Sequence, residues 1–291
     1  MPRPATRWLI HKLIPRTGWI LLMGPPKQGK SAIALDLALH VAQGRDYLGQ
    51  AIDGGPGRVL YLDIDNPDSE IAERMAHLTE AGVSVAGDLY YLHPTAMQGI
   101  KPLDIREARC RDQLRQTVAE WKPDLVIVDV LREAHLADEN DSQEMRGVCD
   151  ALYKIVEGRA LIIVHHTRKI PDDVTDPDPN LYGRGSSYLM GRTDANWILH
   201  GGKLKIVPRF DAPQKFKVEW NDDTNLFRFP ELDGKLRAMS QVLSLCLEYP
   251  DRPHAQLASL AKERWGISRA TYYRYLSGRA CAHMSGPDPA L

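Results

Sequence analysis

The sequence predicts an α/β fold: a mainly parallel sheet with an antiparallel hairpin extension, followed by a small all-α C-terminal domain. Three observations support this prediction. Short β-branched apolar runs alternate with helix-length amphipathic runs over the first 195 residues, which is typical of a parallel sheet covered on both faces. Hairpin-like runs joined by Gly201-Gly202 and Asp222-Asp223 follow them. From residue 236 onward the apolar spacing is helical.

These patterns place the elements in chain order. Parallel strands are predicted over residues 19–23, 59–63, 89–92, 125–129 and 161–164. Crossover helices are predicted over 31–43, 69–81, 105–121 and 142–156. Later strands are predicted over 196–200, 203–207, 216–220 and 226–229, extending the sheet antiparallel. Residues 171–185, rich in Pro, Asp and Gly, predict a loop.

The C-terminal part predicts helices over residues 236–249, 254–265 and 269–276. Gly266 turns the chain between the last two, and Ser268 caps the third. This is typical of a helix-turn-helix or winged-helix-like domain, whose third helix would offer DNA the side chains Arg269, Thr271, Tyr272, Tyr273 and Arg274. A small helical bundle for packing or ring assembly is the alternative. The predicted domains are 1–232 and 236–279, with a disordered tail over 280–291.

Composition narrows the class of protein. The 291 residues carry a net charge of −1, so no global basic field indicates nucleic acid, although a groove can concentrate local charge. The four cysteines, Cys110, Cys149, Cys246 and Cys281, lie far apart and predict reduced thiols in a cytoplasmic protein, not disulfides or a zinc site. No apolar run is long enough to cross a membrane and no secretory leader is visible, so we expect no membrane partner.

Residues 24–31 carry the most informative motif. They read Gly-Pro-Pro-Lys-Gln-Gly-Lys-Ser and fit G-x-x-x-x-G-K-S/T, a phosphate-binding loop. The glycines let successive N–H groups face an anion, Lys30 places a charge on the β/γ-phosphates, and Ser31 supplies a hydroxyl ligand for Mg²⁺. A chance glycine-rich turn is disfavoured by the strand before the loop and the helix after it. The motif predicts ATP and Mg²⁺ bound by Gly24, Pro25, Pro26, Lys27, Gln28, Gly29, Lys30, Ser31 and Ala32.

Carboxylates end two of the predicted strands. Asp129 follows four apolar residues, where an aspartate can orient the Mg²⁺ shell beside the phosphate loop; capping a helix is its alternative role. Hydrolysis also needs a carboxylate near the attacking water. Asp65 lies just past the strand over 59–63, and Asp63 is expected on the same face. We take Asp65 as the base with Asp63 next, while either could cap the following helix.

His165 and His166 follow the apolar run over 161–164. A histidine there can hydrogen-bond the γ-phosphate and report its loss to neighbouring loops. Adjacent side chains on a strand point to opposite faces, so the pair cannot chelate one metal ion well. A histidine bonded within the core is the alternative.

The chain has a phosphate loop, then a strand-end carboxylate, then Asp129, then a His-His pair. Features of this kind occur in the same order in RecA-fold ATPases. Over roughly residues 8–229 the chain most resembles plasmid RepA-type hexameric replicative helicases and their phage and mobile-element relatives. Residues 127–140 and the Arg-Gly-Ser-Ser turn at 184–187 are similar to segments of that family. The resemblance implies a RecA-like P-loop fold and a homo-oligomeric, hexameric ring with ATP at each interface and single-stranded DNA in the channel. The family usually has Glu where this chain has Asp65, one methylene shorter, which implies a tighter site or a slower step.

The resemblance also implies an arginine finger that reaches a neighbouring subunit's ATP. Arg192 lies in the region after Arg-Gly-Ser-Ser where these helicases place a finger, although Asp194 falls at the aligned spot. Arg209 is the alternative, since related rings carry Lys-x-Arg where this chain reads Val207-Pro208-Arg209. The alternative for both Arg192 and Arg209 is a surface arginine on a hairpin.

DNA contacts are expected from loops that face the ring centre. Arg168 and Lys169 follow the histidine pair, and Tyr182 and Tyr188 flank Arg184, where they could stack on bases. Four aspartates in the loop over 171–185 oppose this, because phosphates need Lys and Arg.

Three functions compete. The first is an ATP-dependent DNA helicase, a DNA-dependent ATP hydrolase that couples hydrolysis at subunit interfaces to translocation on single-stranded DNA. The second is a DNA-binding regulatory ATPase in replication or partition, without unwinding, which uses the C-terminal domain on duplex DNA. The third, a small-molecule kinase, is disfavoured because no acceptor-site motif is visible and the hairpin extension suits RecA-type assembly.

Overall fold

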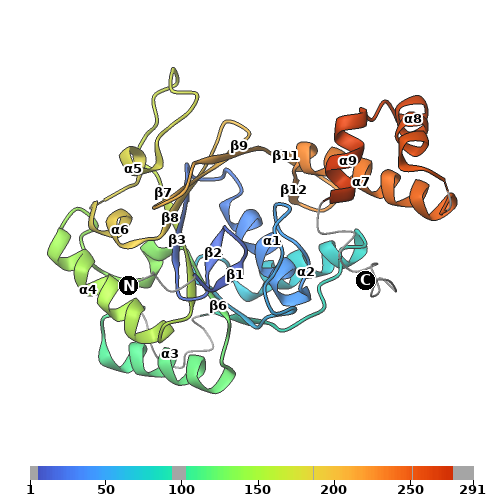
Figure 1. Ribbon diagram of the computed structural model, residues 1–291. Coiled ribbons are helices and arrows are strands. Elements are labelled where there is room, and N and C mark those ends of the chain that lie inside the picture. Colours follow the sequence, from blue (N-terminus) through green and yellow to red (C-terminus); the bar gives the residue numbers. More distant parts are fainter. Residues whose placement is uncertain (1–5, 94–102, 186, 251, 278–291) are drawn as a thin grey trace, which may run out of the picture. The chain divides into compact units, whose positions relative to one another are not determined.

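The computed structural model describes residues 6–93, 103–185, 187–250 and 252–277, and the chain divides into two compact units, Met1–Arg228 and Phe229–Leu291 (Figure 1). The first unit is built on an eight-stranded sheet of order β10-β9-β8-β3-β7-β6-β4-β5. Its strands are β3 (Trp19–Gly24), β4 (Val59–Asp63), β5 (Leu89–Leu92), β6 (Leu125–Asp129), β7 (Ala160–His166), β8 (Ala195–His200), β9 (Lys203–Pro208) and β10 (Gln214–Lys217). The strands from β8 to β5 pair in parallel, and β9 and β10 extend the sheet antiparallel.

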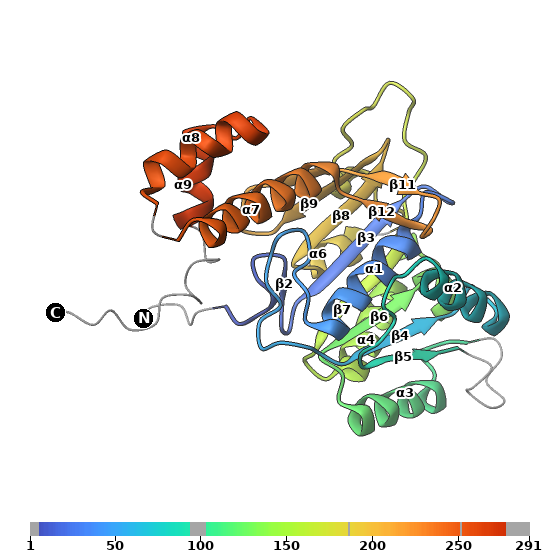
Figure 2. The same cartoon turned by 90° about the vertical axis from the view of Figure 1, so that its right-hand side faces the viewer.

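Helices cover both faces of this sheet (Figures 1 and 2). On one side lie α1 (Lys30–Gln43) and α2 (Asp68–Glu80); on the other lie α3 (Ala108–Trp121), α4 (Ser142–Val156) and α6 (Ser187–Arg192). The strand run over 125–129 is buried throughout, as expected of a strand with helices on both faces. The RecA-like α/β class with a mainly parallel sheet and an antiparallel extension is therefore confirmed.

Several element predictions were wrong in detail. The single strand expected over 216–220 is two strands, because β10 ends at Lys217 and β11 (Glu219–Asn221) pairs with β12 (Leu226–Arg228) in a separate small sheet. The buried Val218 between them donates its N–H to the Gly202 carbonyl at 2.9 Å, in register with the β10–β9 pairs, and the ladder ends there because β9 begins at Lys203. The strand β8, expected in the antiparallel part, pairs in parallel with β3.

Other elements escaped the sequence patterns altogether. The strands β1 (Trp8–Ile10) and β2 (Ile14–Pro15) form an N-terminal hairpin, and the 3₁₀ helix η2 (Leu131–Ala134) follows β6. The expected loop over 171–185 contains α5 (Pro179–Tyr182), whose start is fixed when Asp178 accepts a hydrogen bond from the Asn180 N–H at 2.9 Å. The expected helix over 105–121 begins at Ala108.

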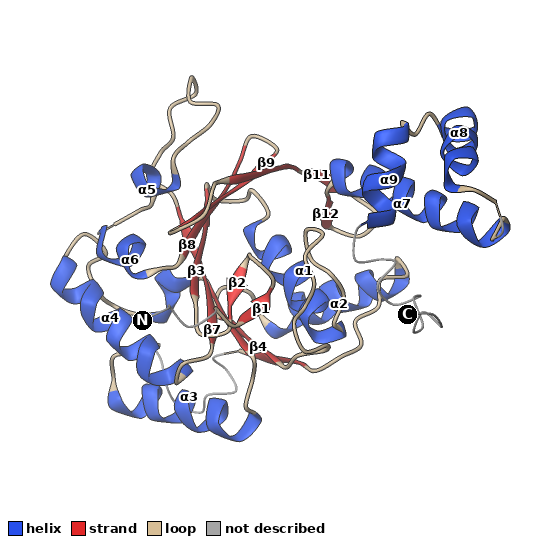
Figure 3. Ribbon diagram, viewed as in Figure 1, coloured by secondary structure: helices blue, strands red, loops and turns tan. Residues whose placement is uncertain are grey.

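The second unit contains α7 (Pro230–Glu248), α8 (His254–Trp265) and α9 (Arg269–Ser277), coloured blue like all helices in Figure 3. Leu245, Leu257, Ala261 and Tyr272 are buried in its own core. Gly266 adopts φ 70° at the end of α8, and the Ser268 hydroxyl accepts the Thr271 N–H at 3.1 Å, so the glycine turn and the serine cap are confirmed. The tail predicted over 280–291 lies outside the described residues.

Two expectations from composition can be compared with the described residues. Cys110, Cys149 and Cys246 are free thiols, and Cys281 lies outside the described part. Among the described helices, none combines the length and the apolar character that a membrane span requires.

Candidate functional site

The carboxyl ends of β3, β4, β6 and β7 meet at one edge of the parallel sheet, where ligands of open α/β sheets bind. An open cavity of about 900 Å³ lies there. Its lining comes from the phosphate loop, the ends of β4, β6 and β7, one face of α2 and the β11–β12 hairpin. The residues are Lys27, Gln28, Gly29, Lys30, Ser31, Ala32, Asp65, Glu70, Glu73, Arg74, His77, Asp129, Val130, Val164, His166, Trp220, Asn225 and Phe227.

The phosphate loop has the geometry that its motif predicts. Gly29 precedes α1 with φ +83°, a conformation that favours glycine. Lys30 is only 6% exposed, and its ammonium donates a hydrogen bond to the Pro25 carbonyl at 2.9 Å. Burial lowers the Lys30 pKa, while the charges of Asp129 and Asp65 counteract that effect. Of the nine residues expected to bind nucleotide, those from Lys27 to Ala32 line the cavity.

Asp129 lies opposite the loop and is held by a tyrosine. Its side chain is buried, and the Tyr61 hydroxyl donates a hydrogen bond to its Oδ2 at 2.6 Å. Burial raises the Asp129 pKa, whereas hydrogen bonds from Tyr61 and Ser31 lower it. The carboxylate is therefore oriented toward Ser31, as a shared Mg²⁺ shell would require. The sequence analysis did not predict a role for Tyr61. The available signal was its hydroxyl group, which lies within the apolar run of β4.

The two candidate bases differ in what they face. Asp65 is exposed and lines the cavity. Asp63 is fully buried, and its Oδ1 accepts hydrogen bonds from the Asn66 N–H at 3.1 Å and from the Asn66 amide at 3.0 Å. Burial, with Asp129 second, raises the Asp63 pKa to about 6. The expectation that both share a face is wrong, because β4 ends at Asp63 and the chain bends at Asp65.

The two histidines separate as strand alternation predicts. His166 lines the cavity, and burial followed by the charge of Lys30 lowers its pKa. His165 is 1% exposed and faces away from the cavity, with Nε2 at 3.3 Å from the Arg184 carbonyl oxygen and Nδ1 at 3.9 Å from the Glu139 carboxylate. Burial lowers the His165 pKa to about 4. Of the two, His166 is the residue placed to meet a phosphate.

One face of α2 contributes residues that the sequence reading missed. Glu70, Glu73, Arg74 and His77 line the cavity at helical i, i+3, i+4 and i+7 spacing, which was the available signal. Arg74 lies 3.6 Å from the Glu70 carboxylate, and its Nη1 is buried without a hydrogen-bond partner among the described atoms.

Both candidate fingers lie outside the cavity of their own chain. The Arg209 guanidinium donates to the carbonyls of Thr193, at 3.0 Å, and of Gly191. The Arg192 guanidinium lies over the Trp19 ring, 5.4 Å from its centroid. Neither arginine can act on this chain's own site from these positions.

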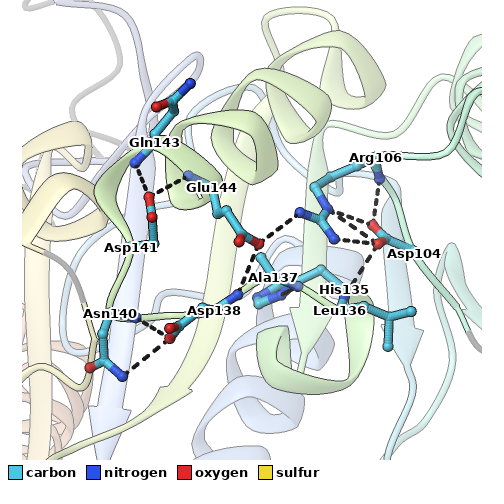
Figure 4. A network of polar contacts seen from close by, with 10 residues as sticks. All are labelled: Asp104, Arg106, His135, Leu136, Ala137, Asp138, Asn140, Asp141, Gln143 and Glu144. Carbon is cyan, nitrogen blue, oxygen red and sulfur yellow. Dashed lines mark hydrogen bonds and ion pairs between the residues drawn. The ribbon is translucent and has the colours of Figure 1, made fainter.

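The segment after Asp129 is fixed by a polar network (Figure 4). Arg106 pairs with Asp104 at 2.7 Å and with Glu144 at 3.2 Å. Glu144 accepts the Asp138 N–H at 3.0 Å, and Asp104 accepts the Leu136 N–H at 3.3 Å. Further along, the buried Glu139 carboxylate binds Arg184 at 3.2 Å. This segment therefore ties the neighbourhood of β6 to the turn that follows β7.

The loop expected to face DNA is partly neutralised. Asp176 pairs with Lys205 at 3.1 Å and with Lys215 at 2.6 Å. Arg168 donates to the Gly185 carbonyl at 2.7 Å, and Lys169 is exposed. Ser186 of the Arg-Gly-Ser-Ser turn lies outside the described residues.

A phosphate loop between a buried strand and a helix, with a strand-end aspartate opposite its serine, on a mainly parallel sheet extended antiparallel at one edge, is the arrangement of a RecA-like P-loop ATPase. A family model described as an AAA domain matches residues 1–172, more than half of the chain, and the chain belongs to this family. Among solved structures, the chain is similar to the KaiC-like protein PH0186 from the hyperthermophilic archaeon Pyrococcus horikoshii OT3. That match has 11% identity and a TM-score of 0.47, and it covers 76% of this chain and 93% of that chain.

Proposed function

We propose that the protein is an ATP-dependent DNA helicase of the replicative RepA/DnaB type. It acts in the cytoplasm as a hexameric ring that hydrolyses ATP at its subunit interfaces and translocates on single-stranded DNA. The observation that carries the proposal is that the nucleotide-binding residues and the candidate arginine fingers lie at separate places on the chain. The phosphate loop, Asp129 and Asp65 lie on one cavity, while Arg192 and Arg209 lie elsewhere on the same chain. A finger from either arginine must then serve a neighbouring copy.

The residues present suit Mg²⁺ bound together with nucleotide. Ser31 and Asp129 supply oxygen ligands, and the Ser31 side chain lies close enough to Asp129 to lower the pKa of its carboxyl. No cluster of three or more His, Cys, Asp or Glu suited to a metal occurs in the described part of the chain. The pair Ser31 and Asp129 fits Mg²⁺, because this ion takes few protein ligands and completes its shell with phosphates and waters. When bound, the ion would neutralise charge on the β- and γ-phosphates.

The remaining steps, which are phosphate binding, positioning of water and sensing of the γ-phosphate, fall to different residues of the chain. Lys30 supplies a positive charge to the phosphates from the start of α1. The backbone N–H groups at this end of the helix, with the helix dipole, also favour the negative charge. Asp65, exposed at the cavity, positions the attacking water. His166 bonds the γ-phosphate and reports its loss along β7, whose end lies beside Arg184 and the loop proposed to hold DNA.

Three measurements test this function. Lys30→Ala should abolish ATP turnover, and surviving hydrolysis would remove the phosphate-loop assignment. The wild-type protein should form a ring in native mass spectrometry with ATP and single-stranded DNA; a monomer under all conditions contradicts a ring motor. It should also displace a strand from a forked duplex in the presence of ATP.

A DNA-binding regulatory ATPase is the second candidate, and the C-terminal unit favours it. Around the Gly266 turn, α9 begins with Arg269 exposed and carries Tyr273 and Arg274 exposed one turn later. These side chain types suit duplex grooves and phosphates. ATP-dependent binding to duplex DNA without strand displacement would support this candidate against the helicase.

A further inference from the structure

The β11–β12 hairpin lies directly against the phosphate loop. A Cβ placed on Gly29 would come within 2.6 Å of Phe227 Cε2 and 3.5 Å of Trp220 Cζ3. Both rings therefore lie beside Gly29, in the space that a side chain at this position of the phosphate loop would occupy. The hairpin is anchored by Leu226 and Val218, which are buried at 7% and 4% exposure. This places an aromatic wall at the site through a segment about 190 residues away in the sequence.

Trp220 is the exposed part of that wall. It is 46% exposed and lines the cavity, and its ring stands edge-to-face on Phe227 with centroids 5.2 Å apart and planes at 78°. Phe227 is half-buried and supports one edge of the indole, while Trp220 itself lines the cavity. Asn225, in the turn of the hairpin, also lines the cavity and is exposed. An exposed indole beside a polar group can stack on a flat ring and hydrogen-bond its edge.

We propose that Trp220, supported by Phe227, is the stacking surface for the purine base of the bound nucleotide, and that the Asn225 amide recognises the edge of the base. The proposal rests on the proposed ATP binding. Lys30, Asp129 and Asp65 account for the triphosphate end of a cavity of about 900 Å³ and leave the hairpin wall for the nucleoside. An asparagine amide can donate and accept at once, which matches the adenine edge.

The test separates base from phosphates. Titration calorimetry in Mg²⁺ would measure ATP, CTP and inorganic tripolyphosphate binding to the wild type, Trp220→Ala, Trp220→Phe and Trp265→Ala. Trp265, 36% exposed in the C-terminal unit, is the matched control for loss of an exposed tryptophan. We expect Trp220→Ala to weaken ATP binding roughly ten-fold or more, as loss of one base–aromatic stack does, and to leave tripolyphosphate binding unchanged. Trp220→Phe should recover most of the loss, and the wild type should prefer ATP over CTP.

The outcomes distinguish this inference from the function on which it rests. If the wild type binds neither ATP nor tripolyphosphate, the proposed function itself fails. If the wild type binds both and Trp220→Ala keeps full ATP affinity, the base lies elsewhere and the inference is overturned. Equal weakening of ATP and tripolyphosphate by Trp220→Ala also overturns it, because the hairpin would then support only the phosphate loop.

Discussion

Tyr61 offers a quantitative test of how Asp129 is held. The Tyr61 hydroxyl donates at 2.6 Å to a carboxylate that is 2% exposed. Tyr61→Phe keeps the ring and leaves that buried oxygen without this donor, which costs about 1–3 kcal/mol of unfolding free energy. Because the hydrogen bond favours the charged form, its loss should raise the Asp129 pKa further above its ordinary value. A higher pH is then needed to ionise the carboxylate.

Tyr91 provides the matched control. Its ring stacks on Tyr61 with centroids 4.6 Å apart and planes at 18°, and the residue is half-buried. Its hydroxyl is buried beside the Tyr61 side chain, and no hydrogen bond joins it to Asp129 among the described atoms. Tyr91→Phe removes an equal volume and no donor to Asp129, so we expect little loss of stability.

Urea unfolding at pH 8 and the pH profile of ATP turnover measure both effects. We expect Tyr61→Phe to lose stability relative to Tyr91→Phe, and its acidic limb of activity to move to higher pH. Equal stability of the two variants together with superimposable pH profiles would refute the role given to the hydroxyl.

The remaining predictions concern four other positions. Asp65→Asn should keep ATP affinity and lower turnover by about 100-fold or more, measured by phosphate release, whereas unchanged turnover would move the base elsewhere. Gly29→Ala should destabilise the fold by at least about 1–2 kcal/mol, because φ is +83° and the new Cβ meets Phe227, and should weaken ATP binding in calorimetry. Burial raises the Asp36 pKa to about 7, so its contribution makes the wild type less stable as pH rises from about 4 to 7. Asp36→Asn should therefore gain about 2–3 kcal/mol relative to wild type between pH 5 and pH 8 in urea unfolding; a pH-independent difference would contradict this. Arg209→Ala subunits mixed with wild type should lower ATP turnover below that of the wild-type fraction, and simple dilution would argue against a finger at this position.

Much of the fold followed from local signals. The bounds of β4, β6, α4 and α8 are those predicted from apolar period alone. The ends of the helices carry their own chemistry: Asp141 accepts the Gln143 N–H at 2.7 Å at the start of α4, for example. Parallel strands bring their carboxyl ends to one edge, so the loop and Asp129 could be placed together from sequence.

The failures have a different physical origin, because they depend on partners distant in sequence. No pattern around residue 218 shows that the partner strand β9 begins only at Lys203, where the β10 ladder runs out and one expected strand becomes two. The start of α7 at Pro230, six residues before the expected helix over 236–249, is the exception. Its signal is local, a proline at the first turn, and the apolar period begins only later. The cavity-facing residues of α2 have a helical spacing that is visible in the sequence. Only the fold, which brings them to the same cavity as the phosphate loop, shows that this spacing marks a site.

At Gly29 the sequence motif and the three-dimensional structure each give a reason for a glycine. The motif requires a glycine there so that the backbone can curl around phosphate, and the positive φ agrees with that requirement. The structure adds a second reason, since Phe227 occupies the space that any side chain at 29 would need. A residue chosen for phosphate binding thus also lets an aromatic wall approach the loop. The two requirements can be separated, because Phe227→Leu relieves the contact and leaves φ unchanged. If this change restores stability to Gly29→Ala without restoring tripolyphosphate binding, the backbone conformation alone governs the phosphates.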